Sequence, residues 1–218
     1  MEKKLVLVGG GGHCKSVIDS IIKTNEYSEI VITDYSLPQG TLVNGCMIVG
    51  DDDCLLELKR SGFQYAFVTT GNVGRPNVRN KLVKKIESLG FEMPIVIDPT
   101  AIVSDDVHIG RGTFIGKNAI INTGVKIGNN CIINTGCIVE HESAIGDLCH
   151  IATGAVLCGG VRIGDECFIG ACSTIIQRIC IENGVVVGAG AVVTNGLPEW
   201  STAVGIPAKV VKYKGNAG

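Results

Sequence analysis

Several features that often reveal a protein's role are scarce in this chain of 218 residues. Lysine and arginine (19) nearly balance aspartate and glutamate (21), so the net charge is −2 and no basic surplus exists to hold nucleic acid or an anionic membrane surface. No apolar run approaches the length of a membrane span, and the run at residues 5–8 is too short for a signal-peptide core. We therefore expect a cytoplasmic protein without nucleic-acid or membrane partners.

The ten cysteines lack the spacing of metal ligands. The sequence contains neither a C-x-x-C pair nor a cysteine and histidine cluster at zinc spacing, so we predict no metal site. Aromatic residues make up only 5% of the chain, and the core must be filled by other types. Four cysteines fall on a regular apolar pattern and are interpreted as small core residues in a reduced compartment: Cys131, Cys137, Cys149 and Cys167.

That pattern is a period of six. Every sixth residue from Ile97 to Val193 is isoleucine, valine or leucine, and a series of mostly small residues lies two positions before most of them. A period of six fits a short strand followed by a corner better than a helix or a long strand. Glycine or asparagine often follows the aliphatic residue, as expected for a turn. We predict that both series point inward in a parallel β-helix, whose coils bury their faces on one another.

The chain before this array has a different pattern. A buried strand at residues 5–8 leads through four glycines, 9–12, into a helical pattern at 16–22, and a second strand at 30–33 ends at Asp34. Strand, glycine turn, helix, strand and acid form the nucleotide-binding βαβ pattern, in which helix N–H groups receive phosphate and the acid receives a sugar hydroxyl. We expect a Rossmann-like α/β domain over residues 1–96 and a β-helix domain with a C-terminal tail over residues 97–218.

Several cues in the first domain leave alternatives open. The glycines do not keep G-x-G-x-x-G spacing, so a tight turn without a ligand is an alternative, although His13 could donate to a phosphate or sugar oxygen. Acids 51–53 are expected to cap a helix that runs through Arg60. Arg79 lies near the loop 69–72 and could meet a phosphate or be a solvated helix charge.

One corner of the hexapeptide array departs from the others. Residues 140–142 read Glu-His-Glu, and His150 follows nine residues after His141. A histidine beside a carboxylate suits general-base catalysis, although exposed polar residues at a corner are the alternative. His108 has no adjacent acid of this kind and is expected to be structural.

These residues resemble a known family. The hexads and Gly-Ile-Pro-Ala-Lys at 205–209 look like the left-handed β-helix acyltransferases. Further motifs make the chain similar to bacterial sugar acetyltransferases, which include nucleotide-linked 4-amino-sugar N-acetyltransferases and sialic-acid O-acetyltransferases: Gly11-Gly12-His13, Asp34, Gly71-Asn72, residues 138–142 and residues 145–147.

The resemblance implies a homotrimer that uses acetyl-CoA as co-substrate. His141 would be the base, Glu142 would raise its basicity, and His150 would lie at the thioester with Ala171 and Ala189 lining the cofactor groove. The sugar nucleotide would be bound by a set in which Tyr35 departs from a commonly acidic position: Gly11, Gly12, His13, Asp34, Tyr35 and Gly71. The longer loop between Asn72 and Arg79, which contains Gly74-Arg75-Pro76, leaves the role of Arg79 open.

The predicted activity is N-acetylation of the 4-amino group of a UDP-linked amino sugar in bacterial surface-glycan synthesis. Sialic-acid O-acetylation is the alternative acceptor chemistry, and Cys158 is a rival nucleophile. A metal-dependent β-helix hydratase would need three histidines to meet between subunits. A binding module would make the Glu-His-Glu corner incidental, and a dehydrogenase is disfavoured because no catalytic domain follows the βαβ unit.

Overall fold

The computed structural model describes residues 2–71 and 77–213, which divide into two compact units. The first unit includes the chain up to Gly71 and from 77 to Pro99, and the second runs on from Thr100. Residues 97–99, which begin the hexapeptide pattern, therefore cluster with the first unit. Within the described residues, no helix is both long and apolar enough to cross a membrane.

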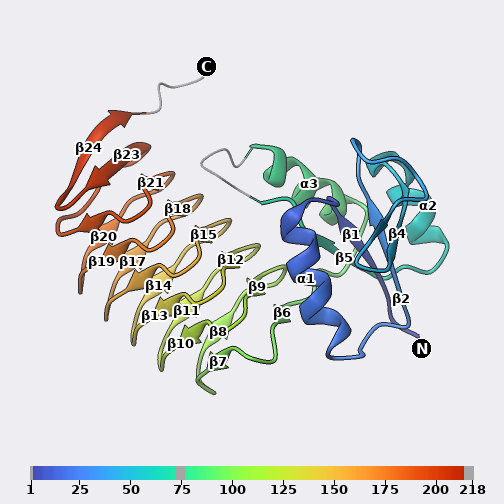
Figure 1. Cartoon of the computed structure of the whole chain (residues 1–218), viewed down its shortest axis with the longest axis horizontal. Coiled ribbons are helices and arrows are strands. Elements are labelled where there is room, and N and C mark those ends of the chain that lie inside the picture. Colours follow the sequence, from blue (N-terminus) through green and yellow to red (C-terminus); the bar gives the residue numbers. More distant parts are fainter. Residues whose placement is uncertain (1, 72–76, 214–218) are drawn as a thin grey trace. The chain divides into compact units, whose positions relative to one another are not determined.

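The first unit is an α/β sandwich built on a five-stranded sheet in the order β3-β4-β2-β1-β5 (Figure 1). All neighbours are parallel except β3 and β4, which form an antiparallel hairpin. Its elements are β1 (Lys4–Val8), α1 (Gly12–Ile22), β2 (Glu29–Thr33), β3 (Leu42–Val43), β4 (Cys46–Gly50), the 3-10 turn η1 (Asp52–Cys54), α2 (Leu55–Arg60), β5 (Tyr65–Val68), α3 (Asn77–Ser88) and β6 (Val96–Ile97).

Strand β1 lies inside the sheet, between β2 and β5, and its side chains from Leu5 to Val8 are fully buried on both faces, as a parallel strand covered by helices requires. The chain leaves β1 toward β2 on one side, whereas β5 lies on the other side. The carboxyl ends of β1 and β5 lie side by side, with Val8 paired to Val68, and the strand order reverses between them. Such a switch point is where open α/β sheets bind ligands.

The local expectations for this unit hold with two adjustments. Helix α1 starts at Gly12, four residues before the predicted start, because glycines at a helix N-terminus carry no apolar signal. The β3–β4 hairpin was missed. Asp51 caps η1 by accepting a hydrogen bond from the Asp53 N–H (2.9 Å), and α2 ends at Arg60 as predicted.

The second unit is a left-handed parallel β-helix of short strands (Figure 1). Its strands are β7 (Ile102–Val103), β8 (His108–Ile109), β9 (Phe114–Ile115), β10 (Ile120–Ile121), β11 (Lys126–Ile127), β12 (Ile132–Ile133), β13 (Ile138–Val139), β14 (Ala144–Ile145), β15 (His150–Ile151), β16 (Val156–Leu157), β17 (Arg162–Ile163), β18 (Phe168–Ile169), β19 (Thr174–Ile175), β20 (Cys180–Ile181), β21 (Val186–Val187), β22 (Val192–Val193), β23 (Ser201–Gly205) and β24 (Ala208–Tyr213).

Each coil contributes one strand to each of three sheets, and a residue pairs with the one 18 positions away. Ile120 pairs with Ile138 in the sheet β22-β19-β16-β13-β10-β7, and Lys126 pairs with Ala144 in the sheet β20-β17-β14-β11-β8. In the third sheet, His150 pairs with Phe168. The antiparallel hairpin β23–β24 ends the third sheet.

The two inward series form the core of the β-helix, as predicted. From Ile115 to Val193 every member of the aliphatic series is buried. The expectation is wrong at Ile97, which is exposed and belongs to the first unit. The first array members, Val103 and Ile109, are only partly buried because fewer coils cover them.

The four cysteines expected in the core are buried and free of disulfides. Cys131, Cys149 and Cys167 stack at intervals of one coil, and each thiol donates to a carbonyl of the next coil at 3.0 Å. Burial raises the pKa of Cys137 to about 12 and that of Cys149 well above its ordinary value. These thiols are packing groups rather than nucleophiles.

The glycines after the aliphatic residues serve a purpose other than the one predicted. Gly128 does not have a positive φ; instead, a Cβ there would lie 2.4 Å from Asp147 Oδ1 and 2.7 Å from the Gly146 carbonyl carbon. Close approach of neighbouring coils therefore requires this glycine. The left-handed conformation falls further along the turn, at positions such as Gly124, where φ is +70°.

Candidate functional site

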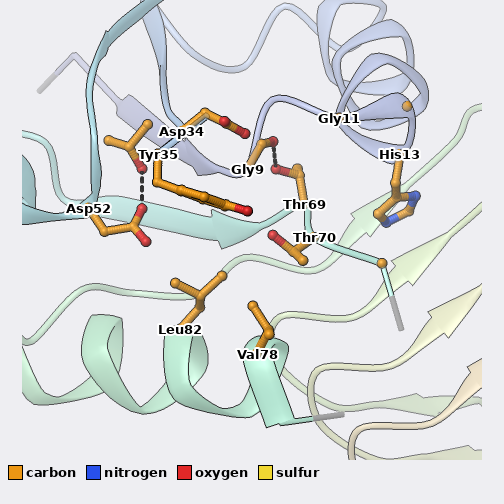
Figure 2. Close-up of a pocket in the computed structure, with 13 residues that line it drawn as sticks. Gly9, Gly11, His13, Asp34, Tyr35, Asp52, Thr69, Thr70, Val78 and Leu82 are labelled. Atoms are coloured by element: carbon orange, nitrogen blue, oxygen red, sulfur yellow. Dashed lines mark hydrogen bonds between the residues drawn. The ribbon is translucent and has the colours of Figure 1, made fainter. Parts of the chain in front are cut away.

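The first unit contains a cavity of about 250 Å³ at the switch point of its sheet (Figure 2). The chain segments that follow β1, β2, β4 and β5 all contribute to it, since parallel strands end at one edge. All six residues predicted to hold the sugar nucleotide line this cavity: Gly11, Gly12, His13, Asp34, Tyr35 and Gly71. Their binding role stays a prediction.

The four glycines of the turn have two different physical causes. Gly9 has a φ of +108°, and a Cβ there would lie 2.4 Å from Thr70 Oγ1; at Gly10 it would lie 2.9 Å from the Leu37 side chain. At Gly11 and Gly12, in contrast, an added Cβ would have no neighbouring atom within 4 Å. The fold itself requires the first two glycines, whereas the last two leave open space at the N-terminus of α1.

That helix terminus has the features of an anion site. Gly11 is the N-cap residue and supplies no side-chain cap, and no acidic residue lies in the first turn. The first N–H groups of a helix have no partner within the helix, and the helix dipole favours a negative ligand there. His13 lies in the first turn and its ring lines the same cavity (Figure 2).

Asp34 stabilises the glycine turn at residues 9–12 through hydrogen bonds from the other side of the cavity. Its Oδ2 accepts a hydrogen bond from the Gly10 N–H (2.6 Å), while Oδ1 accepts from the N–H (2.8 Å) and hydroxyl (2.7 Å) of Ser36 and from the Leu37 N–H (3.0 Å). Burial alone would raise the pKa of Asp34, but these donors outweigh it and lower the pKa. The carboxylate is therefore ionised, and only Oδ2 has capacity left for a ligand hydroxyl.

Four cavity residues were missed by the sequence interpretation: Thr33, Asp52, Val78 and Leu82. Asp52 was grouped with its neighbours as a capping acid, yet Asp51 does the capping. Asp52 instead accepts a hydrogen bond from the Thr33 hydroxyl (3.0 Å) at the cavity wall. Burial raises its pKa, against the opposing effects of that hydrogen bond and of Lys85. Position after a strand end was the signal that could have identified it.

Arg79 is neither a phosphate ligand nor a solvated charge. Its side chain is fully buried, and Nη1 donates to the carbonyls of Val68 (2.7 Å) and Thr70 (2.8 Å). The guanidinium therefore fixes the loop after β5, which forms the cavity floor. Asn72 and the residues Gly74, Arg75 and Pro76 lie outside the described part of the chain.

His141 lies at the exposed turn between β13 and β14 in the second unit. Its side chain is 56% exposed, and Nδ1 is 3.8 Å from Oε2 of Glu142, which is 80% exposed. A Cβ at Gly159 would lie 2.6 Å from His141 Nε2, so the imidazole packs directly on the backbone of the next coil. The ring is thus positioned and accessible, and its carboxylate neighbour stays beyond hydrogen-bonding distance.

His150 has a different environment from His141. It is buried in β15, its ring meets Phe168 edge-on at 5.2 Å, and its Nε2 is 3.3 Å from the side-chain nitrogen of Asn134. An amide nitrogen can only donate, so Nε2 accepts and the proton of a neutral ring resides on Nδ1. The side chain is consequently held in one orientation.

Ala171 and Ala189 occupy equivalent corners of two successive coils. The Ala171 carbonyl accepts the Gly190 N–H (2.8 Å). Within residues 2–71 and 77–213, the N–H groups of the two alanines donate to no acceptor. Two such donors, one coil apart, can receive the amide carbonyls of an extended ligand.

Cys158 is partly buried, and its backbone carbonyl accepts from the Ser143 hydroxyl (3.1 Å). Across the described residues, no group of three or more histidine, cysteine, aspartate or glutamate side chains is arranged to hold a metal ion.

A cavity at the switch point of an α/β unit and a histidine at a β-helix corner are the features expected of a hexapeptide-repeat sugar transferase. Family models agree: the PglD N-terminal domain matches residues 4–86, the GMPPB C-terminal domain matches residues 91–175, and the hexapeptide repeat of succinyl-transferase matches residues 160–196. A comparison with curated protein sequences found no significant match.

Three solved structures are similar over nearly their whole length. A variant of perosamine N-acetyltransferase from Caulobacter crescentus, with CoA and GDP-perosamine, is 36% identical over 98% of this chain and 97% of that one (TM-score 0.90). The acetyltransferase domain of PglB from Neisseria gonorrhoeae, with acetyl coenzyme A, is 33% identical over 97% and 100% (0.89). WeeI from Acinetobacter baumannii is 27% identical over 96% and 100% (0.82). This chain belongs to the hexapeptide-repeat sugar acetyltransferases, which confirms the resemblance.

Proposed function

We propose that this protein transfers the acetyl group of acetyl-CoA to the 4-amino group of a nucleotide-linked amino sugar in surface-glycan synthesis. The observation that carries the proposal is the accessible imidazole of His141, held on Gly159 at a hexapeptide corner. The perosamine N-acetyltransferase relative, solved with CoA and GDP-perosamine, supports the substrates. Two solved forms of that relative carry a histidine replaced by asparagine or alanine.

His141 acts as the general base. It takes a proton from the acceptor amine while the amine nitrogen attacks the acetyl carbonyl, and the carbon–sulfur bond then breaks to release coenzyme A as a thiolate. His150, with its tautomer set by Asn134, stabilises the negative charge on the carbonyl oxygen. The backbone N–H groups of Ala171 and Ala189 hold the pantetheine amides.

The N-terminal cavity binds the nucleotide. The diphosphate lies at the N-terminus of α1, against Gly11, Gly12 and His13, and Asp34 Oδ2 accepts a ribose hydroxyl. The sequence predicts a UDP carrier, whereas the perosamine relative was solved with a GDP carrier.

A homotrimer completes the catalytic corner. Ile102, Ile120, Ile138 and Val156 stand in register on the outer face of one β-helix sheet and form an apolar strip. Ile102 and Ile120 are exposed, and a continuous strip of this kind marks an interface. Since β13 ends two residues before His141, a second copy seated on the strip would form a wall of the open corner. The enzyme would act in the cytoplasm, where acetyl-CoA and nucleotide sugars are made.

The test is an acetyl-transfer assay with wild type, His141→Ala and a control, His108→Ala, which removes an exposed histidine from strand β8. Acceptors are GDP- and UDP-linked 4-amino sugars, free sialic acid and CMP-sialic acid. Products are followed by chromatography, because the exposed thiols of Cys172 and Cys180 would consume a thiol reagent.

Transfer to an amino-sugar nucleotide that is lost only in His141→Ala would support the proposal. If only sialic acids are acetylated, the proposed acceptor is wrong, but the role of His141 as the base stands. Full activity in His141→Ala, or no transfer to any acceptor, would overturn it in favour of another base or a binding role.

A further inference from the structure

Asp52 lies in the cavity wall, and the fold makes little use of its carboxylate. Its two neighbours each have a structural role. Asp51 caps η1, and the 92% exposed carboxylate of Asp53 pairs with Lys85 at 3.0 Å. Asp52 accepts a single hydrogen bond, from the Thr33 hydroxyl to Oδ1. Within the described residues, no donor reaches its Oδ2. A half-buried carboxylate with an unused oxygen on a cavity is arranged to accept hydrogen bonds from a ligand.

The cavity beside Asp52 has apolar surfaces suited to a flat ring. Tyr35 is 88% exposed, and its ring extends along the cavity between Asp52 and Thr70 (Figure 2). Val78 and Leu82 line the same cavity from one face of α3, four residues apart. An aromatic side chain this exposed buries little in the fold, but it offers a stacking surface for a nucleobase.

A carboxylate distinguishes bases by their hydrogen-bonding edges. Guanine presents two adjacent donors, N1–H and the N2 amino group, which match the two oxygens of a carboxylate. Uracil presents one donor, N3–H, between two carbonyl oxygens, so a carboxylate that accepts this proton also faces an oxygen that it repels. The repulsion of uracil therefore adds to the preference for guanine that the two hydrogen bonds create.

We propose that Asp52 selects a guanine nucleotide as the sugar carrier, with Tyr35 stacked on the base. The inference rests on the proposed nucleotide-sugar function, and it replaces the UDP carrier predicted from the sequence by GDP. Asp52 reads the base edge, whereas the turn at Gly11 and Gly12 binds the diphosphate common to both carriers.

The test is calorimetric titration of the full chain with GDP and, separately, with UDP. We expect GDP to bind about 10- to 100-fold more tightly, the range for one bidentate contact to a base. Asp52→Asn should abolish or invert this ratio, because the amide can still accept from Thr33 while also donating to a uracil carbonyl. Asp53→Asn, a matched change on the same turn, should leave the ratio unchanged.

Tyr35→Ala separates stacking from reading of the base edge. It should lower the affinities for GDP and UDP by similar factors, about 10-fold, and leave the ratio of the two affinities unchanged. If Asp52 had only a structural role, Asp52→Asn would lower the affinities for GDP and UDP together and leave their ratio unchanged. Thermal unfolding of each variant is measured to detect such a loss of structure.

A wild-type protein that binds UDP as tightly as GDP, or an Asp52→Asn ratio equal to that of wild type, would overturn the proposal and leave acetyl transfer intact. If neither nucleotide binds, both this proposal and the nucleotide-sugar function fail. Selective GDP binding without transfer to any GDP-linked amino sugar would support the role of Asp52 in base selection while removing the proposed reaction.

Discussion

The cavity of the α/β unit and the His141 corner differ in how much of a site one chain can build. In the α/β unit, ends of four parallel strands converge, and Asp34 alone accepts four hydrogen bonds from the surrounding turns. At the β-helix corner, His141 and Glu142 are largely exposed, and the imidazole Nδ1 is 3.8 Å from the nearest carboxylate oxygen.

The difference follows from topology. A twisted parallel sheet brings residues distant in sequence to one edge and encloses them, whereas a β-helix brings together residues one coil apart on a convex surface. A concave site arises from one chain in the first case and needs a second surface in the second. The effects of substitutions at the corner should therefore depend on trimer formation, whereas the effects of substitutions at the cavity should not.

Removal of the corner base is expected to have the largest effect. His141→Ala should lower kcat/KM by about 10²- to 10⁴-fold, the usual contribution of a general base, with unchanged thermal unfolding because the ring is exposed. Steady-state kinetics of acetyl transfer measure this. A loss of kcat/KM below about 3-fold would show that another residue is the base.

The apolar strip offers the next test. Ile120→Glu should raise the trimer dissociation constant by about 100-fold, since an unpaired charge in an interface costs several kcal/mol. Sedimentation at several concentrations measures the dissociation, and activity should fall with it while GDP affinity stays constant. A monomer with full activity would show that the corner works alone.

The glycine turn separates folding from binding. Gly12→Ala should weaken GDP about 10-fold by filling the open space at the start of α1, yet leave stability equal or raise it by up to about 1 kcal/mol. Gly9→Ala should instead destabilise the fold by about 1–3 kcal/mol, because of its positive φ and the contact with Thr70. Denaturant unfolding and calorimetry of both variants test the contrast. Equal GDP affinity in Gly12→Ala would contradict a phosphate site there.

Glu142→Gln is expected to have the smallest effect. An exposed pair 3.8 Å apart is worth about 0.2–1 kcal/mol, so kcat/KM should fall by about 1.5- to 5-fold. Glu140→Gln is the comparison, because Glu140 accepts from Asn122 (3.0 Å) instead of facing the imidazole. A 100-fold loss in Glu142→Gln would mean that a partner chain encloses the corner and strengthens the pair.

Much of the β-helix could be predicted because its information is local. A six-residue period determines which side chains point inward, and the core from Ile115 to Val193 follows it without exception. The period does not show why Gly128 is a glycine, because the atom that excludes a side chain belongs to Asp147 in the next coil.

The α/β unit was less predictable at the level of single residues. The glycine turn and Asp34 follow a known pattern, but Arg79 and Asp52 depend on what surrounds them. Nothing local distinguishes a buried arginine that fixes a loop from a solvated one, or Asp52 from the capping Asp51 one residue earlier.

The sequence by itself determined the two fold types, the inward residues of the coils and the set of glycines, acid and histidine that line the cavity, since each is written in a short repeat or motif. Only the tertiary structure decided that Arg79 is internal, that Asp52 lines the cavity and that the corner of His141 is open. Those properties depend on distances between segments far apart in the chain, and periodicity carries no information about such distances.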